Sequence, residues 1–279
     1  MKTNPAATVS LHVVLVFLAG VSLMPLLWLV CATVKRGDDL FAYALLPWDH
    51  LDRLTLNNFR ELFARESFGR WLLNSLFLAS THTVVVVMLS SLGGFALAKY
   101  RFRGKKPLML MMLGTMLLPS QVLLPSSYEL MNQFGWINSY LAVLVPGAVS
   151  VFGLFLFRQT IATTVPDDLL AAGRVDGCSE FRLWWDVVLP VVRPMTGAFT
   201  LMSFLAAWNS FLWPQIVLQD EGKYTLPIAL ANMVGLPEYQ AEYGVLMAGT
   251  LVSIAPVVLL FAILQKEFIA GLSSGAVKG

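Results

Sequence analysis

Residues 9–34 read VSLHVVLVFLAGVSLMPLLWLVCATV and contain no Lys, Arg, Asp or Glu. An α-helix needs roughly 20 mostly apolar residues to cross a bilayer core of about 30 Å, and this run exceeds that length. It is also longer than the apolar core of a secretory signal peptide, which has about 7–15 residues. We therefore expect a membrane span that stays in the protein.

The rest of the chain has the same apolar character. Of 279 residues, 57% are hydrophobic and 13% are charged, whereas an average soluble domain has about 25% charged residues. So little charge excludes an ordinary soluble enzyme and a disordered protein, and a net charge of +2 gives no reason to expect nucleic-acid binding. Cys31 and Cys178 suggest neither a disulfide framework nor a metal site.

Five further apolar stretches have the length of a span. The six expected spans cover residues 10–34, 71–98, 108–131, 140–161, 195–218 and 243–264. Lipid offers no hydrogen-bond partner to an unpaired backbone, so each span has to be helical. The sequence thus predicts an all-α polytopic membrane protein with six transmembrane helices, in a single transmembrane domain over residues 1–279. Pro119 and Pro125 interrupt the third span.

The link between the second and third spans sets the orientation. Residues 99–106 contain five Lys or Arg and no acid, which is typical of a cytoplasmic loop. Alternation of the six spans then predicts that both termini are cytoplasmic and that segment 162–194 is a cytoplasmic loop.

That loop, TVPDDLLAAGRVDGCSEFRLWWDVVLP over residues 164–190, predicts two short helices. Thr164 can cap the first helix, Gly177 can end it, Ser179 can cap the second, and Pro190 can stop it. The second helix carries an apolar stripe of Phe181, Trp184, Trp185 and Val188. The stripe either packs on the chain's own spans or docks into a groove of a separate cytoplasmic protein.

Three stretches together resemble one family. Ala171-Ala172-Gly173, followed by Asp176-Gly177 and Leu189-Pro190, is similar to the EAA loop of membrane subunits of bacterial ATP-binding-cassette (ABC) importers. The tail GLSSGAVKG at 271–279 and the segment WNSFLWP at 208–214 resemble the carbohydrate, or maltose-type, permeases of that group.

The resemblance implies a multi-pass permease of the bacterial cytoplasmic (inner) membrane that moves a sugar-like solute by alternating access. It implies a second permease subunit, a cytoplasmic ATPase dimer, an extracytoplasmic solute-binding protein and surrounding membrane lipid as partners. The chain has no P-loop motif, so we expect no cofactor, metal or catalytic residue in it; ATP and Mg are used by the partner ATPase. No nucleic-acid partner is expected.

The resemblance also assigns contact residues. Coupling to the ATPase falls to Ala171, Ala172, Gly173, Asp176, Gly177, Phe181, Trp184, Leu189 and Pro190. Ser274, Gly275, Val277 and Lys278 form an extended tail that enters a crevice between the ATPase subunits. Asn232, Gly235, Pro237 and Tyr239 contact the binding protein. Ala171 stands where the family has glutamate, so we expect the lost polar contact to shift to Asp167, to Asp168 or to the paired permease.

Polar residues within the spans suggest a solute cavity. Gln121, Trp208, Asn209 and Trp213 are the candidates, because amides and tryptophan faces suit a neutral, hydroxyl-rich solute. The alternative is hydrogen bonding between helices. We expect His82 to be a packed, neutral side chain. An ion-coupled secondary transporter or channel is the alternative function, although it would favour charged residues within the spans, and an intramembrane enzyme would need a catalytic constellation that we do not find.

Overall fold

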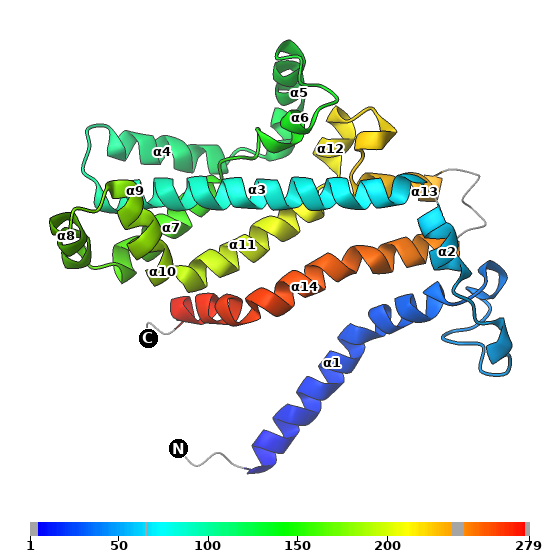
Figure 1. Cartoon of the computed structure of the whole chain (residues 1–279). Coiled ribbons are helices and arrows are strands. Elements are labelled where there is room, and N and C mark those ends of the chain that lie inside the picture. Colours follow the sequence, from blue (N-terminus) through cyan, green and yellow to red (C-terminus); the bar gives the residue numbers. More distant parts are fainter. Residues whose placement is uncertain (1–4, 65, 236–242, 277–279) are drawn as a thin grey trace. The chain divides into compact units, whose positions relative to one another are not determined.

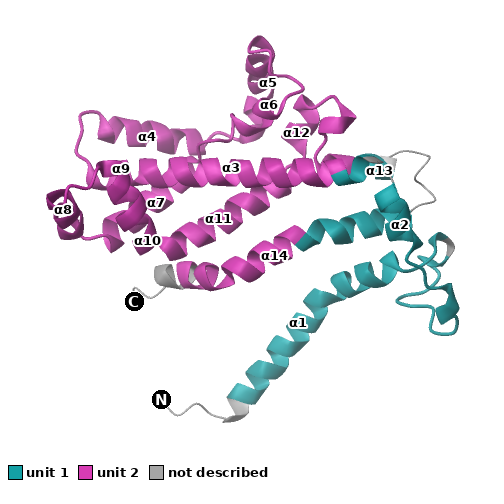
Figure 2. Cartoon of the chain, viewed as in Figure 1, with its two compact units in different colours: residues 1–69, 230–255 teal, residues 70–229, 256–279 magenta. Residues whose placement is uncertain are grey.

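A computed structural model describes the backbone of residues 5–64, 66–235 and 243–276, and most of their side chains. All regular structure in these ranges is helical (Figure 1), which confirms the predicted all-α class. The chain forms two compact units, residues 1–69 with 230–255 and residues 70–229 with 256–279 (Figure 2). Each unit is described by itself below.

The long helices are α1 (Pro5–Thr33), α3 (Glu66–Lys99), α11 (Arg193–Trp208) and α14 (Tyr243–Ala276). Shorter α-helices are α2 (Asn57–Ala64), α4 (Lys105–Met116), α5 (Leu124–Gln133), α6 (Tyr140–Leu144), α7 (Val151–Thr164), α8 (Asp167–Val175), α9 (Glu180–Arg182), α10 (Leu189–Val191), α12 (Leu212–Val217) and α13 (Leu226–Gly235). A π-helix, η4, covers Leu183–Val188. Short 3₁₀ turns cover Gly37–Asp39 (η1), Leu51–Arg53 (η2), Ser120–Leu123 (η3) and Glu221–Lys223 (η5).

Three helices in the described residues are long and apolar enough to cross a membrane, over Thr8–Thr33, Ser67–Lys99 and Tyr243–Gly271. They correspond to the first, second and sixth predicted spans. Two bent helix pairs, Lys105–Met116 with Ser120–Gln133 (95°) and Glu180–Val191 with Arg193–Trp208 (89°), raise the number to five if each pair is one span. The count of six remains a prediction.

Three predicted spans are not single straight helices. The third bends at Pro119, because a proline cannot continue the hydrogen-bond ladder. The fourth is divided into α6 and α7 by residues 145–150, which include Pro146 and Gly147, a typical turn pair. The fifth is divided into α11 and α12 by residues 209–211.

In the second unit, small residues let the long helices approach closely. A β-carbon added at Gly93 of α3 would lie 2.3 Å from Leu154 Cδ2 of α7, and one added at Gly153 would lie 2.4 Å from Phe199 Cζ of α11. Such small-residue contacts are typical of membrane helices, which lack a hydrophobic driving force for packing in lipid. They hold α3, α7 and α11 together (Figure 1).

In the first unit, buried polar groups fix the segment between α1 and α2. The Lys35 ammonium donates to the carbonyls of Leu40 and Tyr43. The Asn58 side-chain amide, from the start of α2, donates to the carbonyls of Thr33 and Lys35. These hydrogen bonds tie the C-terminal end of α1 to α2.

Candidate functional site

The first helix of the coupling loop (residues 162–194) begins later than predicted. The prediction that Thr164 caps it is wrong, because Thr164 forms the last residue of α7. Val165 is extended, as a residue before a proline prefers, and Pro166 takes the N-cap position of α8. Two acids, Asp167 and Asp168, lie in the first turn of α8, where the helix dipole favours negative charge.

The turn between the two helices follows the prediction. Gly177 has φ +81°, in the left-handed region that glycine enters without steric cost. The Ser179 hydroxyl accepts a hydrogen bond from the backbone N–H of Arg182 at 3.3 Å and so caps α9. Both assignments are confirmed.

The second helix does not stop at Pro190. It runs from α9 through the π-helix η4 into α10, and the sharp bend comes only at Val192, before α11. A proline in a regular α-helix clashes with the carbonyl four residues earlier. The π turns that precede Pro190 follow a wider bonding pattern, and the helical path continues past it.

The apolar stripe of the second helix is divided between two environments. Trp184 and Val188 are fully buried in a core with Phe157 of α7 and Phe199 of α11. Trp185, at 53% exposure, and Phe181, at 58%, face outward. Packing on the chain's own helices is therefore confirmed for Trp184 and Val188. Docking of Phe181 and Trp185 on a separate protein stays a prediction.

The coupling loop exposes four large apolar side chains, Leu169 and Val175 of α8 with Phe181 and Trp185. We call these four side chains the loop face. The assigned residues Ala171, Ala172 and Asp176 are also exposed, as are Gly177 and Pro190, whereas Leu189 is half-buried against the core. Trp184 belongs to the support of the loop and not to its exposed face.

Close packing fixes α8 against η4. A β-carbon added at Gly173 would lie 2.4 Å from Leu183 Cδ2, and Leu183 is fully buried. Gly173 thus faces inward, in contrast with the exposed Ala171 and Ala172.

Charged groups tie the coupling loop to the end of α3. The Lys99 ammonium donates to the Val165 carbonyl and to Asp167 Oδ1, both at 2.6 Å, and this bond and charge hold the pKa of Asp167 below its ordinary value. Asp167, one expected substitute for the missing glutamate, is therefore paired within the chain, and Asp168 is exposed.

A second group spans the turn. Arg174 donates to both carboxylate oxygens of Glu180, at 2.7 and 3.1 Å, and the Tyr100 hydroxyl donates to Glu180 Oε2. The Arg174 and Tyr100 hydrogen bonds lower the pKa of Glu180. Burial and the bond to Glu180 raise the pKa of Tyr100.

The two other predicted contact segments lie largely at the edge of the described residues. The helix α14 continues to Ala276, so Ser274 and Gly275 are helical and not extended, which corrects that prediction; Val277 and Lys278 lie outside the described residues. Asn232 is half-buried on α13 and Gly235 ends that helix. Pro237 and Tyr239 lie outside the described residues.

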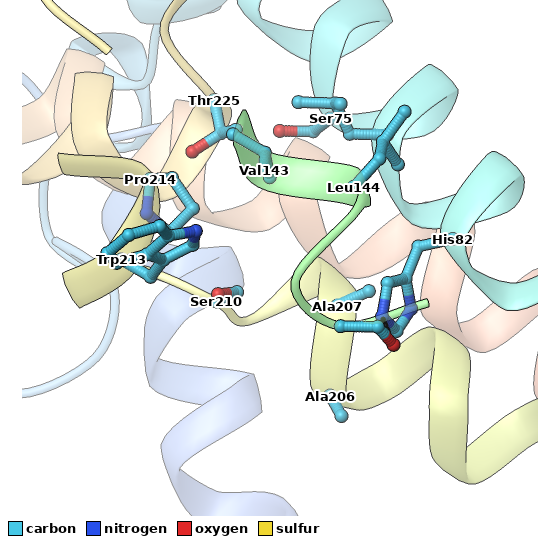
Figure 3. Close-up of a pocket in the computed structure, with 12 residues that line it drawn as sticks. Ser75, His82, Val143, Leu144, Ala206, Ala207, Ser210, Trp213, Pro214 and Thr225 are labelled. Carbon is cyan, nitrogen blue, oxygen red and sulfur yellow. Dashed lines mark hydrogen bonds between the residues drawn. The ribbon is translucent and has the colours of Figure 1, made fainter. Parts of the chain in front are cut away.

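A cavity of about 260 Å³ opens between α3, α6, α11 and α12 (Figure 3). Ser75 and His82 project into its wall from α3, and the Trp213 ring from α12. The Trp213 indole N–H donates to the Ala142 carbonyl at 2.8 Å, which fixes the ring. Thr225 is buried in the wall, and its hydroxyl has no hydrogen-bond partner among the described residues.

A neighbouring cavity of about 430 Å³ shares Trp213 and is also lined by Gln121. The structure therefore brings together two of the four predicted cavity residues. Trp208 does not line either cavity, because it is buried and stacks on Phe204. Asn209 donates its side-chain amide to the Leu205 carbonyl at 2.9 Å.

Several polar residues of the cavity wall were not among the predicted ones. Ser75 and His82 are seven residues apart on α3 and so share a helix face, a spacing that could have indicated them. His82 Nε2 lies 3.0 Å from the Gly147 carbonyl oxygen, which makes it a packed histidine that also lines the cavity. Thr225 lies in a loop, where no periodicity indicates its direction.

Residues 87–273 match the family model described as "Binding-protein-dependent transport system inner membrane component". The chain belongs to this family. The match includes the coupling loop and most of the cavity wall. Within the described residues, no group of three or more His, Cys, Asp or Glu could hold a metal ion.

Relatives of this transport component cover 95–100% of its length. The chain is 34% identical to the arabinooligosaccharides transport system permease protein AraQ of Halalkalibacterium halodurans, over 100% of this chain and 99% of the relative. It is 30% identical to the lactose transport system permease protein LacG of Rhizobium radiobacter, over 95% and 94%. It is 28% identical to the sn-glycerol-3-phosphate transport system permease protein UgpE of Escherichia coli, over 98% of each.

The fold is shared with a solved structure. A chain of a bacterial ABC transporter involved in the import of the acidic polysaccharide alginate superposes with a TM-score of 0.83 at 21% identity, over 96% of this chain and 98% of that one. Family membership makes this chain a multi-pass inner-membrane transport subunit and not an enzyme, with ATP hydrolysis in a partner.

Proposed function

We propose that this permease moves a neutral sugar or oligosaccharide inward, with a second permease subunit, a cytoplasmic ATPase dimer that uses ATP and Mg, and an extracytoplasmic binding protein. The proposal draws on the named substrates of two relatives, arabinooligosaccharides and lactose. The proposal also includes six spans, two cytoplasmic termini and transport by alternating access. Family membership does not favour the ion-coupled alternative.

The loop face carries this proposal. Phe181 and Trp185 are exposed on a segment whose other aromatic, Trp184, is fully buried and fixed in the core. An apolar helix face on a rigid support is what a helix-in-groove contact requires. Motion of a docked ATPase would pass through η4 and α10 into α11, which follows them at the 89° bend.

The cavity supports the choice of solute class. Its wall carries hydroxyls from Ser75 and Thr225, the Trp213 ring and the imidazole of His82, and no Lys, Arg, Asp or Glu. Ligand sites combine a mainly apolar wall with a few placed polar groups. A neutral, hydroxyl-rich solute suits such a wall better than an ion does.

The test is uptake by the complex reconstituted in proteoliposomes with its binding protein. We expect sugar uptake that needs both the binding protein and ATP, with the ATP supplied on the side of the membrane where the ATPase lies. Uptake driven by an ion gradient without ATP would contradict the proposal.

The loop face is tested by Trp185→Ala, which should weaken co-purification of the ATPase. Trp48, at 68% exposure between α1 and α2, is the control, since Trp48→Ala removes a tryptophan that is at least as exposed and lies outside the loop face. Equal ATPase recovery from both variants would argue against docking at this surface.

A further inference from the structure

Two consecutive residues at the end of α3 reach both halves of the coupling loop. Lys99 holds the start of α8 through the Val165 carbonyl and Asp167. Tyr100 reaches across to Glu180, the first residue of α9. The same short stretch of chain therefore contacts both helices, one on each side of the Gly177 turn.

Tyr100 is itself fixed. Its ring packs edge-on against Phe95 of α3, with the ring centroids 5.5 Å apart and the planes at 84°. It also lies against the buried core that contains Trp184 and Val188. The hydroxyl that meets Glu180 thus comes from a rigid base and not from a mobile surface side chain.

Glu180 closes the arrangement across the turn. Its carboxylate receives Arg174 from the last turn of α8 in a two-point contact, and receives the Tyr100 hydroxyl as well. A bidentate Arg–carboxylate contact fixes direction as well as distance. Beside the packing of Gly173 on Leu183, this carboxylate links α8 to α9 directly across the turn.

We propose that Tyr100, Arg174 and Glu180 are positioning residues that make the loop face move as one piece with the end of α3. This inference rests on the proposed function, because it assigns a route by which the ATPase's motion reaches the spans. Tyr100 transmits the motion to α3, and α10 transmits it to α11. Without the cluster, only the packing of Gly173 on Leu183 would resist a tilt of α8 about Gly177.

A stabilising role alone does not account for this placement. Exposed ion pairs contribute little to stability on average, and the loop has another such pair that spans no turn. Arg182 Nε lies 3.3 Å from Asp186 Oδ2, four residues apart on one helical path. That pair can be removed without freeing one helix from the other.

The experiment compares the two pairs in the reconstituted complex. Tyr100→Phe, Arg174→Gln and Glu180→Gln are measured against Arg182→Gln and Asp186→Asn, with ATP hydrolysed per solute imported as the readout. We expect the first three variants to raise this ratio at least about two-fold. That factor corresponds to the lower end of the coupling energies found between contacting residues. The ATPase should still co-purify, and the two control variants should match the wild type.

The Arg174→Gln/Glu180→Gln double variant should be no worse than either single variant, because both remove the same link. Tyr100→Phe deletes one hydroxyl and keeps the ring, so it remains informative if a charge variant assembles poorly. A wild-type ratio in Tyr100→Phe and Glu180→Gln, in a complex that transports, would overturn the inference and leave the proposed function standing. Failure of the wild-type complex to import sugar would count against the proposed function instead.

Discussion

Gly94 of α3 lies directly against Phe157 of α7, so that a β-carbon at position 94 would lie 2.5 Å from Phe157 Cβ and 2.9 Å from the backbone nitrogen of Arg158. The neighbour here is backbone, which cannot turn aside as a side-chain tip can. The adjacent Gly93 faces only the Cδ2 end of Leu154. The contact at Gly94 therefore sets how closely α3 and α7 approach.

Gly94→Ala should lower the thermal stability of the purified protein, because the two helices must separate. Overpacking of this kind costs about 1–3 kcal/mol, which exceeds the roughly 1 kcal/mol that alanine gains over glycine in a helix. Gly93→Ala is the control and should be milder. Equal melting temperatures for the two variants would show that the backbone contact does not limit the packing.

Gly177→Val should destabilise the coupling loop by about 1–2 kcal/mol, the cost of a left-handed conformation for a residue with a β-carbon. Nothing lies within 4 Å of a β-carbon at this position, so crowding is not the cause. Gly177→Asn should be tolerated, since asparagine enters this conformation more easily. Proteolysis of the loop can be followed in both variants, and equal cleavage rates would contradict this account.

The stability that the Lys99–Asp167 pair contributes should fall on acidification. Because Lys99 depresses the pKa of Asp167 in the folded protein, the pair contributes above the ordinary pKa of aspartate and is lost as the pH falls through the folded value. Asp167→Asn should therefore have a lower melting temperature than the wild type near neutral pH. The difference in melting temperature should shrink below about pH 4. Melting curves across this range test it, and a difference that grew on acidification would refute the sign.

Thr225→Val should impair sugar uptake with little change in stability. The threonine hydroxyl is buried, faces the cavity and bonds to no described residue, so its removal breaks no internal hydrogen bond. Valine keeps the shape of the side chain. Ser75→Ala is a contrasting variant, because the Ser75 hydroxyl accepts the backbone N–H of Leu226 at 2.6 Å and its loss leaves that donor unpaired. Normal uptake kinetics in Thr225→Val would exclude this hydroxyl from the solute path.

The long uninterrupted helices were the part of the fold that hydropathy predicted well. The uncharged run at 9–34 became most of α1, and 71–98 lies within α3. Hydropathy does not show where a span is broken, because the overall apolar character of residues 140–161 hides the Pro146–Gly147 turn signal. Residues 145–150 lie between helices for that reason.

The coupling loop also has features that the sequence predicts and features that it does not. Gly177 and Ser179 act locally, through their own conformation and one hydrogen bond, and could be predicted from the sequence. The burial of Trp184 beside the exposed Trp185 could not, because a π-helix changes the angular step that an α-helical stripe assumes. Nor does any pattern in the sequence show that Tyr100 reaches Glu180, 80 positions away.

The helix α1 has a consequence for biosynthesis. Its apolar window is only 6% buried by the rest of the chain, against 33% for the window in α3. Of the described helices α1 is synthesised first, and the rest of the chain covers little of it. Its insertion into the bilayer must then depend on the transfer of its own residues from translocon to lipid. One charge placed near Leu18 should therefore delay membrane insertion more than the same charge in the better-covered α3.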